Sequence, residues 1–154
     1  MECSIALRIE AIRPTAVVRC RASLAELPIV VPEACGKVWA LVKSQGIAKA
    51  GRLVAVYLDS QINLEVGVEL DSPIVGAGDL IGSAIPAGRV AAMTHFGPYQ
   101  RLPAAHTAIR LWCATHGHAL AGPNWELYGH WRDEWNQDPS KIVTEVVYLL
   151  APNP

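Results

Sequence analysis

An internal repeat is the feature that most constrains how this chain can fold. Residues 46–51 read GIAKAG and residues 117–122 read GHALAG, so both share the pattern Gly-x-Ala-x-Ala-Gly. A Tyr follows the last Gly of each segment by six residues, as Tyr57 and as Tyr128. A pattern that recurs in the same order indicates that one structural unit occurs twice.

A second pair of segments extends the repeat. Residues 64–70 read LEVGVEL and residues 144–150 read TEVVYLL, which places Glu65 opposite Glu145. Both segments lie downstream of the Gly-x-Ala-x-Ala-Gly segment of their own half. The matches therefore keep one order in both halves, and the sequence predicts a tandem duplication.

Alternation of apolar and polar residues predicts where the strands lie. Strands are expected near residues 3–11, 15–22, 52–58, 63–70, 88–96, 124–131 and 142–150. Each half therefore supplies a strand before its helical segment and two strands after it.

Two stretches with helical spacing of apolar residues lie between these strands. A helix is predicted over 31–45, with Pro32 in its first turn, where proline is tolerated, and Gly46 just past its end. A second helix is predicted over 102–113, with Gly117 closing it in the same way.

These elements predict an α+β fold made of two strand–helix–strand–strand units. Side by side, the units form one antiparallel sheet with two helices on one face and a ligand groove at the pseudo-twofold axis. We expect a single domain over 1–154, with repeat one at about 3–72, a Pro/Gly-rich linker at about 73–87, and repeat two at about 88–152.

Composition limits the classes of function. Hydrophobic residues make up 51% of the 154 residues and charged residues 18%, with a formal net charge of −1 and no basic stripe. Binding to nucleic acid or to an anionic membrane therefore has little electrostatic support. The apolar excess fits a ligand pocket or a homodimer interface. With no visible signal peptide or membrane-spanning run, a cytoplasmic location is expected.

The sequence predicts neither a cofactor nor a metal. Cys3, Cys20, Cys35 and Cys113 match no zinc spacing and are expected to be reduced thiols. The His-x-His pair at residues 116–118 lacks a third ligand with suitable spacing.

The two halves differ in their aromatic and acidic residues. All five His and eight of the ten aromatic side chains lie in the second half. Glu126 stands where the first half has Ala55, in a strand-like run that places it on the same face as Tyr128. Glu145 has apolar neighbours, so it either faces water at an edge, is buried with a partner, or awaits a cation.

Three motifs and a helix with a central Trp together resemble a known family. The motifs are Gly-Pro-Tyr-x-x-Leu at 97–102, Gly-Pro-x-Trp-Glu-x-Tyr at 122–128 and Thr-Glu-Val-x-Tyr-Leu-x-x-Pro at 144–152. In this order they resemble the GyrI-like small-molecule-binding domain, in a stand-alone form. The same domain is the effector-binding half of multidrug-responsive regulators.

The resemblance implies a fold of two such units with a ligand groove between them, and binding of bulky, apolar, often cationic compounds. Glu145 matches the family's acidic residue that meets the positive charge, Tyr99 matches the Tyr of the first motif, and Glu126 and Tyr128 match the Glu-x-Tyr pair. The other expected ligand contacts are aromatic and imidazole side chains: Trp39, Trp112, His95 and His130. We expect no counterpart of the regulators' DNA-binding region in this sequence, because the first predicted strand begins within the first ten residues.

Several functions fit this pattern. The first is a binding protein that sequesters or senses xenobiotics. The second is a hydrolase of strained electrophiles of the cyclopropane type, with Glu126 or Glu145 as general base and Tyr99 or Tyr128 as proton donor. The third is a protein-interaction inhibitor of the gyrase type, and the fourth is haem binding, which rests only on the His-rich second half.

Overall fold

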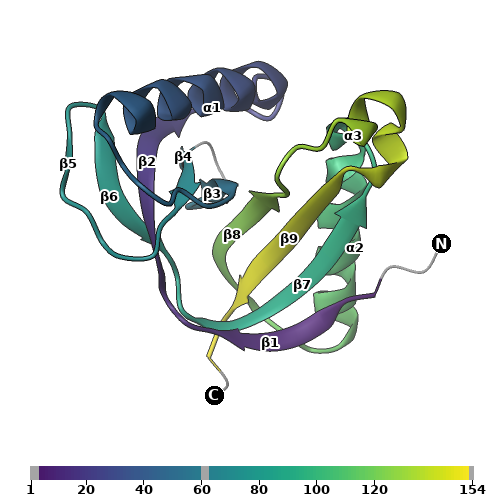
Figure 1. The fold of residues 1–154 in the computed structure, drawn as a ribbon. Coiled ribbons are helices and arrows are strands. Elements are labelled where there is room, and N and C mark those ends of the chain that lie inside the picture. The colour runs from purple at the N-terminus through teal and green to yellow at the C-terminus, as the bar shows by residue number, and fades with distance from the viewer. Residues whose placement is uncertain (1–3, 60–62, 153–154) are drawn as a thin grey trace.

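The computed structural model describes residues 4–59 and 63–152, and its main body is one large antiparallel sheet (Figure 1). The strands are β1 Ala6–Glu10, β2 Arg13–Arg21, β3 Leu53–Tyr57, β4 Asn63–Glu69, β5 Gly76–Ala77, β6 Leu80–Ile85, β7 Gly88–Phe96, β8 Leu120–Tyr128 and β9 Val143–Leu150. The helices are α1 Leu27–Ser44, α2 Leu102–Thr115 and α3 Glu134–Gln137, with short 3-10 turns η1 Tyr99–Arg101 and η2 Pro139–Lys141.

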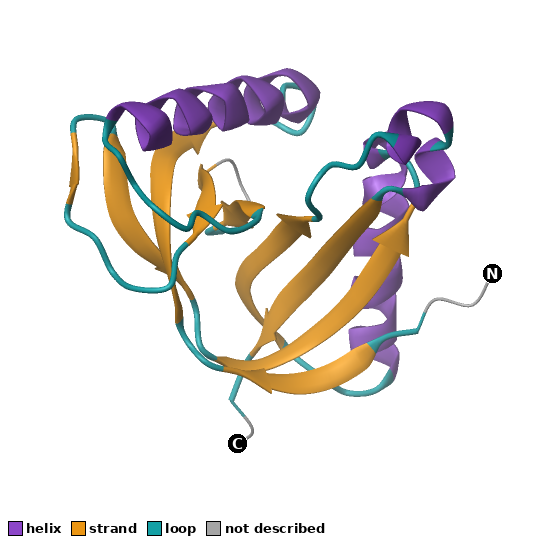
Figure 2. Ribbon diagram, in the orientation of Figure 1, coloured by secondary structure: helices purple, strands orange, loops and turns teal. Residues whose placement is uncertain are grey.

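The sheet has nine strands in the order β1-β7-β9-β8-β3-β4-β2-β6-β5, and each neighbouring pair is antiparallel. Helix α1 packs on β2 and β4, and α2 packs on β7 and β9, so each long helix covers its own half of the sheet (Figure 2). Tyr128 packs against the apolar clusters under both helices, so the two helices share one face. The predicted α+β class and antiparallel sheet are confirmed.

The two halves have the same strand order around their junction. The first half runs β3-β4-β2 away from the centre, and the second half runs β8-β9-β7. At the centre Leu53 lies opposite Tyr128, Ala55 opposite Glu126, and Tyr57 opposite Asn124. Tyr57 and Tyr128, which are counterparts in the repeat, lie at equal distances along their strands from the Ala55–Glu126 pair, so the pairing of the two halves is symmetric about that pair. An origin by duplication stays a prediction.

The strand that precedes each half pairs with the other half. β1 pairs with β7 of the second half, and β6 pairs with β2 of the first half. The stretch 73–87, expected as a plain linker, therefore contains β5 and β6. Its Pro and Gly residues suggested a loop, but Leu80 and Ile85 are buried and anchor β6 in the sheet.

Two further boundaries differ from the sequence expectation. α1 begins at Leu27, so Pro28 occupies its first turn and Pro32 lies inside the helix, not at its start. β8 runs from Leu120 to Tyr128 with a register shift against β9, so it starts and ends earlier than the predicted 124–131.

The face turned away from the helices is also buried. Its core comes from β3, β6, β7, β8 and β9: Val54, Val56, Ile85, Val90, Ala92, Trp125, Leu127 and Val147. Because β6 is not a neighbour of β3 or β8 in the sheet, a shared cluster requires the sheet to curl over this face. Among the described residues, no helix is long and apolar enough to span a bilayer.

Candidate functional site

Glu126 lies at the centre of the sheet, on the face that carries the helices. It is 5% exposed and stands opposite Ala55, whose small side chain leaves room for it. Its Oε1 accepts hydrogen bonds from the Tyr57 hydroxyl at 3.2 Å and the Tyr128 hydroxyl at 2.5 Å. Tyr57 and Tyr128 each lie two residues past the Ala55–Glu126 pair on their own strand, so their side chains share its face.

Helix α2 supplies the third contact to this carboxylate. His106 Nε2 lies 2.6 Å from Glu126 Oε2, and His106 Nδ1 lies 2.6 Å from the Tyr148 hydroxyl. Arg110, one helical turn after His106, donates to the same hydroxyl at 3.0 Å. An arginine can only donate, so the Tyr148 oxygen accepts from Arg110. With the Tyr148 hydroxyl as donor to Nδ1, a neutral imidazole carries its proton on Nε2 and donates it to Glu126. The contacts form a continuous relay from the surface residue Arg110 to the buried carboxylate.

The partners of the Glu126 carboxylate differ from those of the other buried or half-buried Glu side chains that form ion pairs in the described chain, which pair with arginines. Glu65 pairs with Arg19, Glu69 with Arg13 and Arg52, and Glu145 with Arg8 and Arg52. Glu126 pairs with His106, and no Arg or Lys in the described part of the chain contacts its carboxylate. Hydrogen bonds from three side chains therefore replace the fixed cation that a buried carboxylate usually needs.

The two tyrosines that contact Glu126 are held in their protonated form. Burial, then the charge of Glu126, raises the pKa of Tyr57 and of Tyr128 well above the ordinary tyrosine value. Both hydroxyls therefore stay hydrogen-bond donors at neutral and moderately alkaline pH.

Tyr99 and Cys35 lie over the outer side of Tyr128. The Tyr99 ring meets the Tyr128 ring edge to face, with centroids 5.7 Å apart, and Tyr99 is 39% exposed. Cys35 of α1 is close enough that its ionisation would raise the pKa of both tyrosines. Burial raises the pKa of the Cys35 thiol itself to about 11. The α1 side of the cluster is thus an uncharged thiol and an aromatic edge.

Glu145 lies on the opposite face of the sheet from Glu126. It stands opposite Leu127, which belongs to the core away from the helices, and its carboxylate contacts Arg8 and, at 3.5 Å, Arg52. The structure therefore does not bring Glu145 together with Tyr128, and a role of Glu145 in ligand binding stays a prediction. Side chains alternate along β9, so Tyr148 on the helix face puts Glu145 on the other.

The remaining expected contacts lie outside the Glu126 network. Trp112 stacks on His116 and His118, with centroids 4.2 and 5.5 Å apart. His95 Nε2 lies 3.4 Å from the Pro98 carbonyl oxygen. His130 is exposed beyond β8, and Trp39 is exposed on α1.

The structure adds four residues to the site that the sequence interpretation did not select: Tyr57, His106, Arg110 and Tyr148. Three of them carried a signal. Tyr57 is the repeat counterpart of Tyr128, and His106 and Arg110 have the spacing of one helix turn. Nothing in the sequence alone brings that turn to Glu126.

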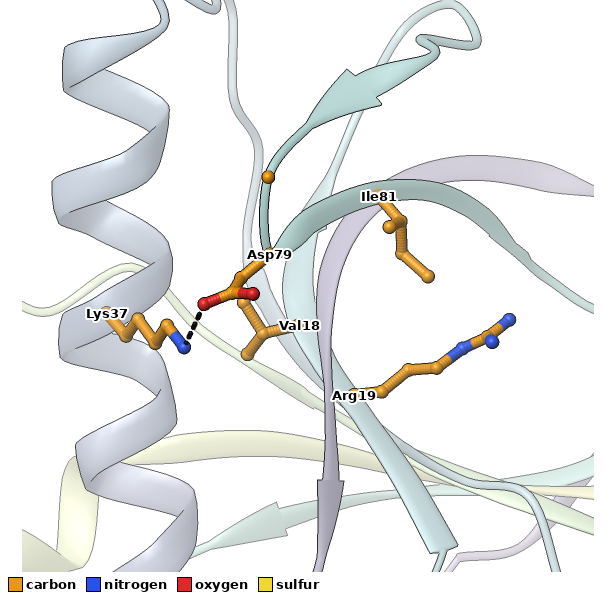
Figure 3. A pocket seen from close by; sticks show the side chains of 6 residues that line it. Val18, Arg19, Lys37, Asp79 and Ile81 are labelled. Atoms are coloured by element: carbon orange, nitrogen blue, oxygen red, sulfur yellow. Dashed lines mark hydrogen bonds and ion pairs between the residues drawn. The ribbon is translucent and has the colours of Figure 1, made fainter.

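The hollow drawn in Figure 3 lies away from this cluster, between α1, β2 and the β5–β6 connection. Lys37 Nζ crosses it to Asp79 at 2.8 Å, and Arg19 on its wall pairs with Glu65 at 3.3 Å. Its charges are therefore already paired, whereas side chains pack directly around Glu126 where the groove was expected.

Comparison with known proteins supports the resemblance. Residues 7–150 match the model of the GyrI-like small molecule binding domain. The chain belongs to the GyrI-like family. No match is found among the curated proteins.

Solved structures of relatives share the fold. The EcmrR C-terminal domain is 19% identical, with a TM-score of 0.79 over 99% of this chain and 100% of that chain. SAV2435 bound to tetraphenylphosphonium is 10% identical, with a TM-score of 0.72 over 98% of this chain and 94% of that chain. A hydrolase from Listeria innocua encoded by lin2189 is 10% identical, with a TM-score of 0.60 over 96% of this chain and 92% of that chain.

Proposed function

We propose that this GyrI-like protein binds bulky, apolar cations of the xenobiotic type, and that Glu126 meets their positive charge. The observation that carries the proposal is the state of this carboxylate, which is 5% exposed and has no Arg or Lys partner in the described chain. A carboxylate offers about four lone-pair positions, and three donors occupy three of them. A cation that reaches it gains a Coulomb attraction that no fixed cation has already satisfied.

The surroundings of Glu126 suit an organic cation better than a hydrated metal ion. The rings of Tyr57, Tyr128 and Tyr148 surround the carboxylate and His106, and Tyr99 extends the aromatic wall to the surface. Aromatic faces attract cations electrostatically and bury apolar surface at the same time. The described residues contain no group of three or more His, Cys, Asp or Glu side chains that could hold a metal.

Entry of a ligand requires movement of the outer ring. Tyr99 is the exposed member of the aromatic wall, and it packs on Tyr128 only by an edge-to-face contact. Rotation of Tyr99 away from Tyr128 would uncover the Tyr128 ring, whose hydroxyl contacts Glu126. The fold neighbour SAV2435, bound to tetraphenylphosphonium, motivates the choice of that cation as probe.

The test is calorimetric titration of the full-length protein with tetraphenylphosphonium. We expect saturable binding that Glu126→Gln weakens at least about tenfold, since loss of a charge pair is worth about 1–2 kcal/mol or more in a site that excludes water. Glu145→Gln is the matched control, because its carboxylate lies on the opposite face. Loss of affinity in Glu145→Gln with none in Glu126→Gln, both variants being folded, contradicts the assignment.

A hydrolase is the second candidate, and the hydrogen bonds that orient the Glu126 carboxylate favour it. Held in this way, Glu126 can take a proton from an attacking water as general base. Tyr128 is then the proton donor, although its raised pKa suits only a strongly basic leaving oxygen or carbon. Incubation with a cyclopropane-bearing electrophile and mass spectrometry of the product tests this. A hydrolysed product that Glu126→Gln abolishes supports it, and binding without turnover excludes it for that substrate.

A further inference from the structure

β1 forms one edge of the sheet and exposes apolar side chains there. In the strand order it has β7 on one side and no neighbour on the other among the described residues. Leu7 is 47% exposed and Ile9 is 84% exposed. Leu7 stands opposite Ala91, which belongs to the core under α2, so Leu7 lies on the face of the sheet that carries the helices. Ile9, two residues further along the strand, lies on the same face. Both Leu7 and Ile9 are exposed, so α2 does not cover them. An edge strand of this kind readily pairs with another strand.

We propose that β1 pairs antiparallel with β1 of a second copy of this chain, around a twofold axis at Ile9. A twofold axis perpendicular to the sheet keeps each residue on its own face, so only residues of the same face can stand opposite each other. The registers that remain are those centred on a residue, and the charges of β1 distinguish between them.

The charges at positions 8 and 10 select the register. Centred on Arg8, the pair places two arginines opposite each other, and centred on Glu10 it places two glutamates opposite each other. Centred on Leu7, it pairs neither charge with an opposite one. Centred on Ile9, it places Arg8 opposite Glu10 of the partner subunit, and this happens twice by symmetry. Opposite charges across a strand pair stabilise it and like charges destabilise it.

The same register covers the exposed apolar residues on the other face. Ile9 meets Ile9 of the partner subunit, and Leu7 meets Ala11 of the partner subunit. On the charged face, Arg8 already contacts Glu10 and Glu145 of its own chain. The partner's Glu10 adds an acidic group to this row, so the ion pairs continue across the axis. Glu126 lies on β8, three strands from β1 in the sheet order, and takes no part in the contact.

Disulfide trapping of the full-length chain tests the register. Residues opposite each other in an antiparallel pair have Cα atoms about 4.5–5.5 Å apart, within the range of a disulfide. The Ile9→Cys variant therefore crosslinks to its own copy under mild oxidation, and mass spectrometry identifies two identical β1 peptides joined by the new thiol. Leu7→Cys is the matched control, because Leu7 faces Ala11 and not its own copy. Equal crosslinking of both variants above the wild-type background contradicts the register.

Light scattering at increasing protein concentration tests the dimer itself. We expect a dimer that Ile9→Lys dissociates, with Kd raised at least about tenfold, while Leu24→Lys does not, since Leu24 is equally exposed but precedes α1. Arg8→Glu and Glu10→Arg each weaken the dimer, and the double variant restores it. A wild-type chain that stays monomeric at the highest concentration overturns the proposal. Calorimetric titration of Ile9→Lys with tetraphenylphosphonium keeps this test separate from the ligand site.

Discussion

At the scale of single residues, Tyr128 makes the shortest hydrogen bond to the Glu126 carboxylate. Its hydroxyl lies 2.5 Å from Oε1, against 3.2 Å for Tyr57. Tyr128→Phe removes a donor from a buried charge, so we expect the free energy of unfolding to fall by about 1.5–3 kcal/mol, and by less in Tyr57→Phe. Urea denaturation measures both.

A double-mutant cycle assigns this loss to the hydrogen bond. With Glu126→Gln as background, the carboxylate is absent and Tyr128→Phe is expected to cost less than in the wild-type chain. An equal cost in both backgrounds would show that the Tyr128 hydroxyl stabilises the fold through some other contact.

The raised pKa of the Cys35 thiol should make the free energy of unfolding depend on pH in the alkaline range. Burial raises its thiol pKa from 9.0 to about 11, so between these values the folded chain keeps a proton that the unfolded chain has lost. The free energy of unfolding therefore falls as pH rises through this window, and is unaffected by this group below it. In Cys35→Ala we expect a smaller fall over the window. Urea denaturation of both proteins below pH 9 and near pH 11 measures the difference, and parallel curves contradict it.

At the scale of elements, we expect replacement of glycine by alanine to have opposite effects on stability at two positions. A Cβ on Gly67 of β4 would lie 2.0 Å from the Ala16 carbonyl oxygen of β2, so Gly67→Ala forces the strands apart. We expect a loss of stability of about 3 kcal/mol or more. A Cβ on Gly36 of α1 meets nothing within 4 Å, so Gly36→Ala should stabilise by about 0.5–1 kcal/mol. Thermal unfolding followed by circular dichroism compares them, and equal signs for the two variants contradict the packing argument.

The sequence predicted elements best where one residue decides the local conformation. The two long helices, α1 and α2, end before a glycine with positive φ, Gly46 at 65° and Gly117 at 75°, as expected. Prediction from the sequence failed where a strand depends on pairing with a segment that is distant in sequence. The stretch 73–87 resembles a linker because it contains three glycines and two prolines, and only pairing with β2 makes its residues Leu80–Ile85 a strand.

The candidate site shows the same limit at the scale of the whole molecule. Glu126, Tyr128 and Tyr99 lie close together, as the motifs suggested. The motifs left open which of Glu126 and Glu145 faces the groove, because the face of a residue in a strand depends on register, which motifs do not specify. His106 reaches Glu126 only because α2 packs on β7 and β9, so its role follows from tertiary structure.

The exchange of strands between the halves predicts that the whole molecule unfolds as one unit. β1 precedes the first half but pairs in the second, β6 pairs in the first, and the β3–β8 ladder joins the two at the centre. Neither half can lose its sheet without leaving strands of the other unpaired, so we expect a single cooperative transition in urea.

Tryptophan fluorescence and circular dichroism can report on different parts of the molecule in this test. Trp39 is the only Trp of the first half, and the other four lie after residue 100. In Trp39→Phe, tryptophan fluorescence therefore reports the second half alone, while circular dichroism reports both helices and the whole sheet. We expect the two transitions to coincide. A fluorescence midpoint separated from the circular dichroism midpoint would mean that the halves unfold independently, as two modules joined only by a linker would.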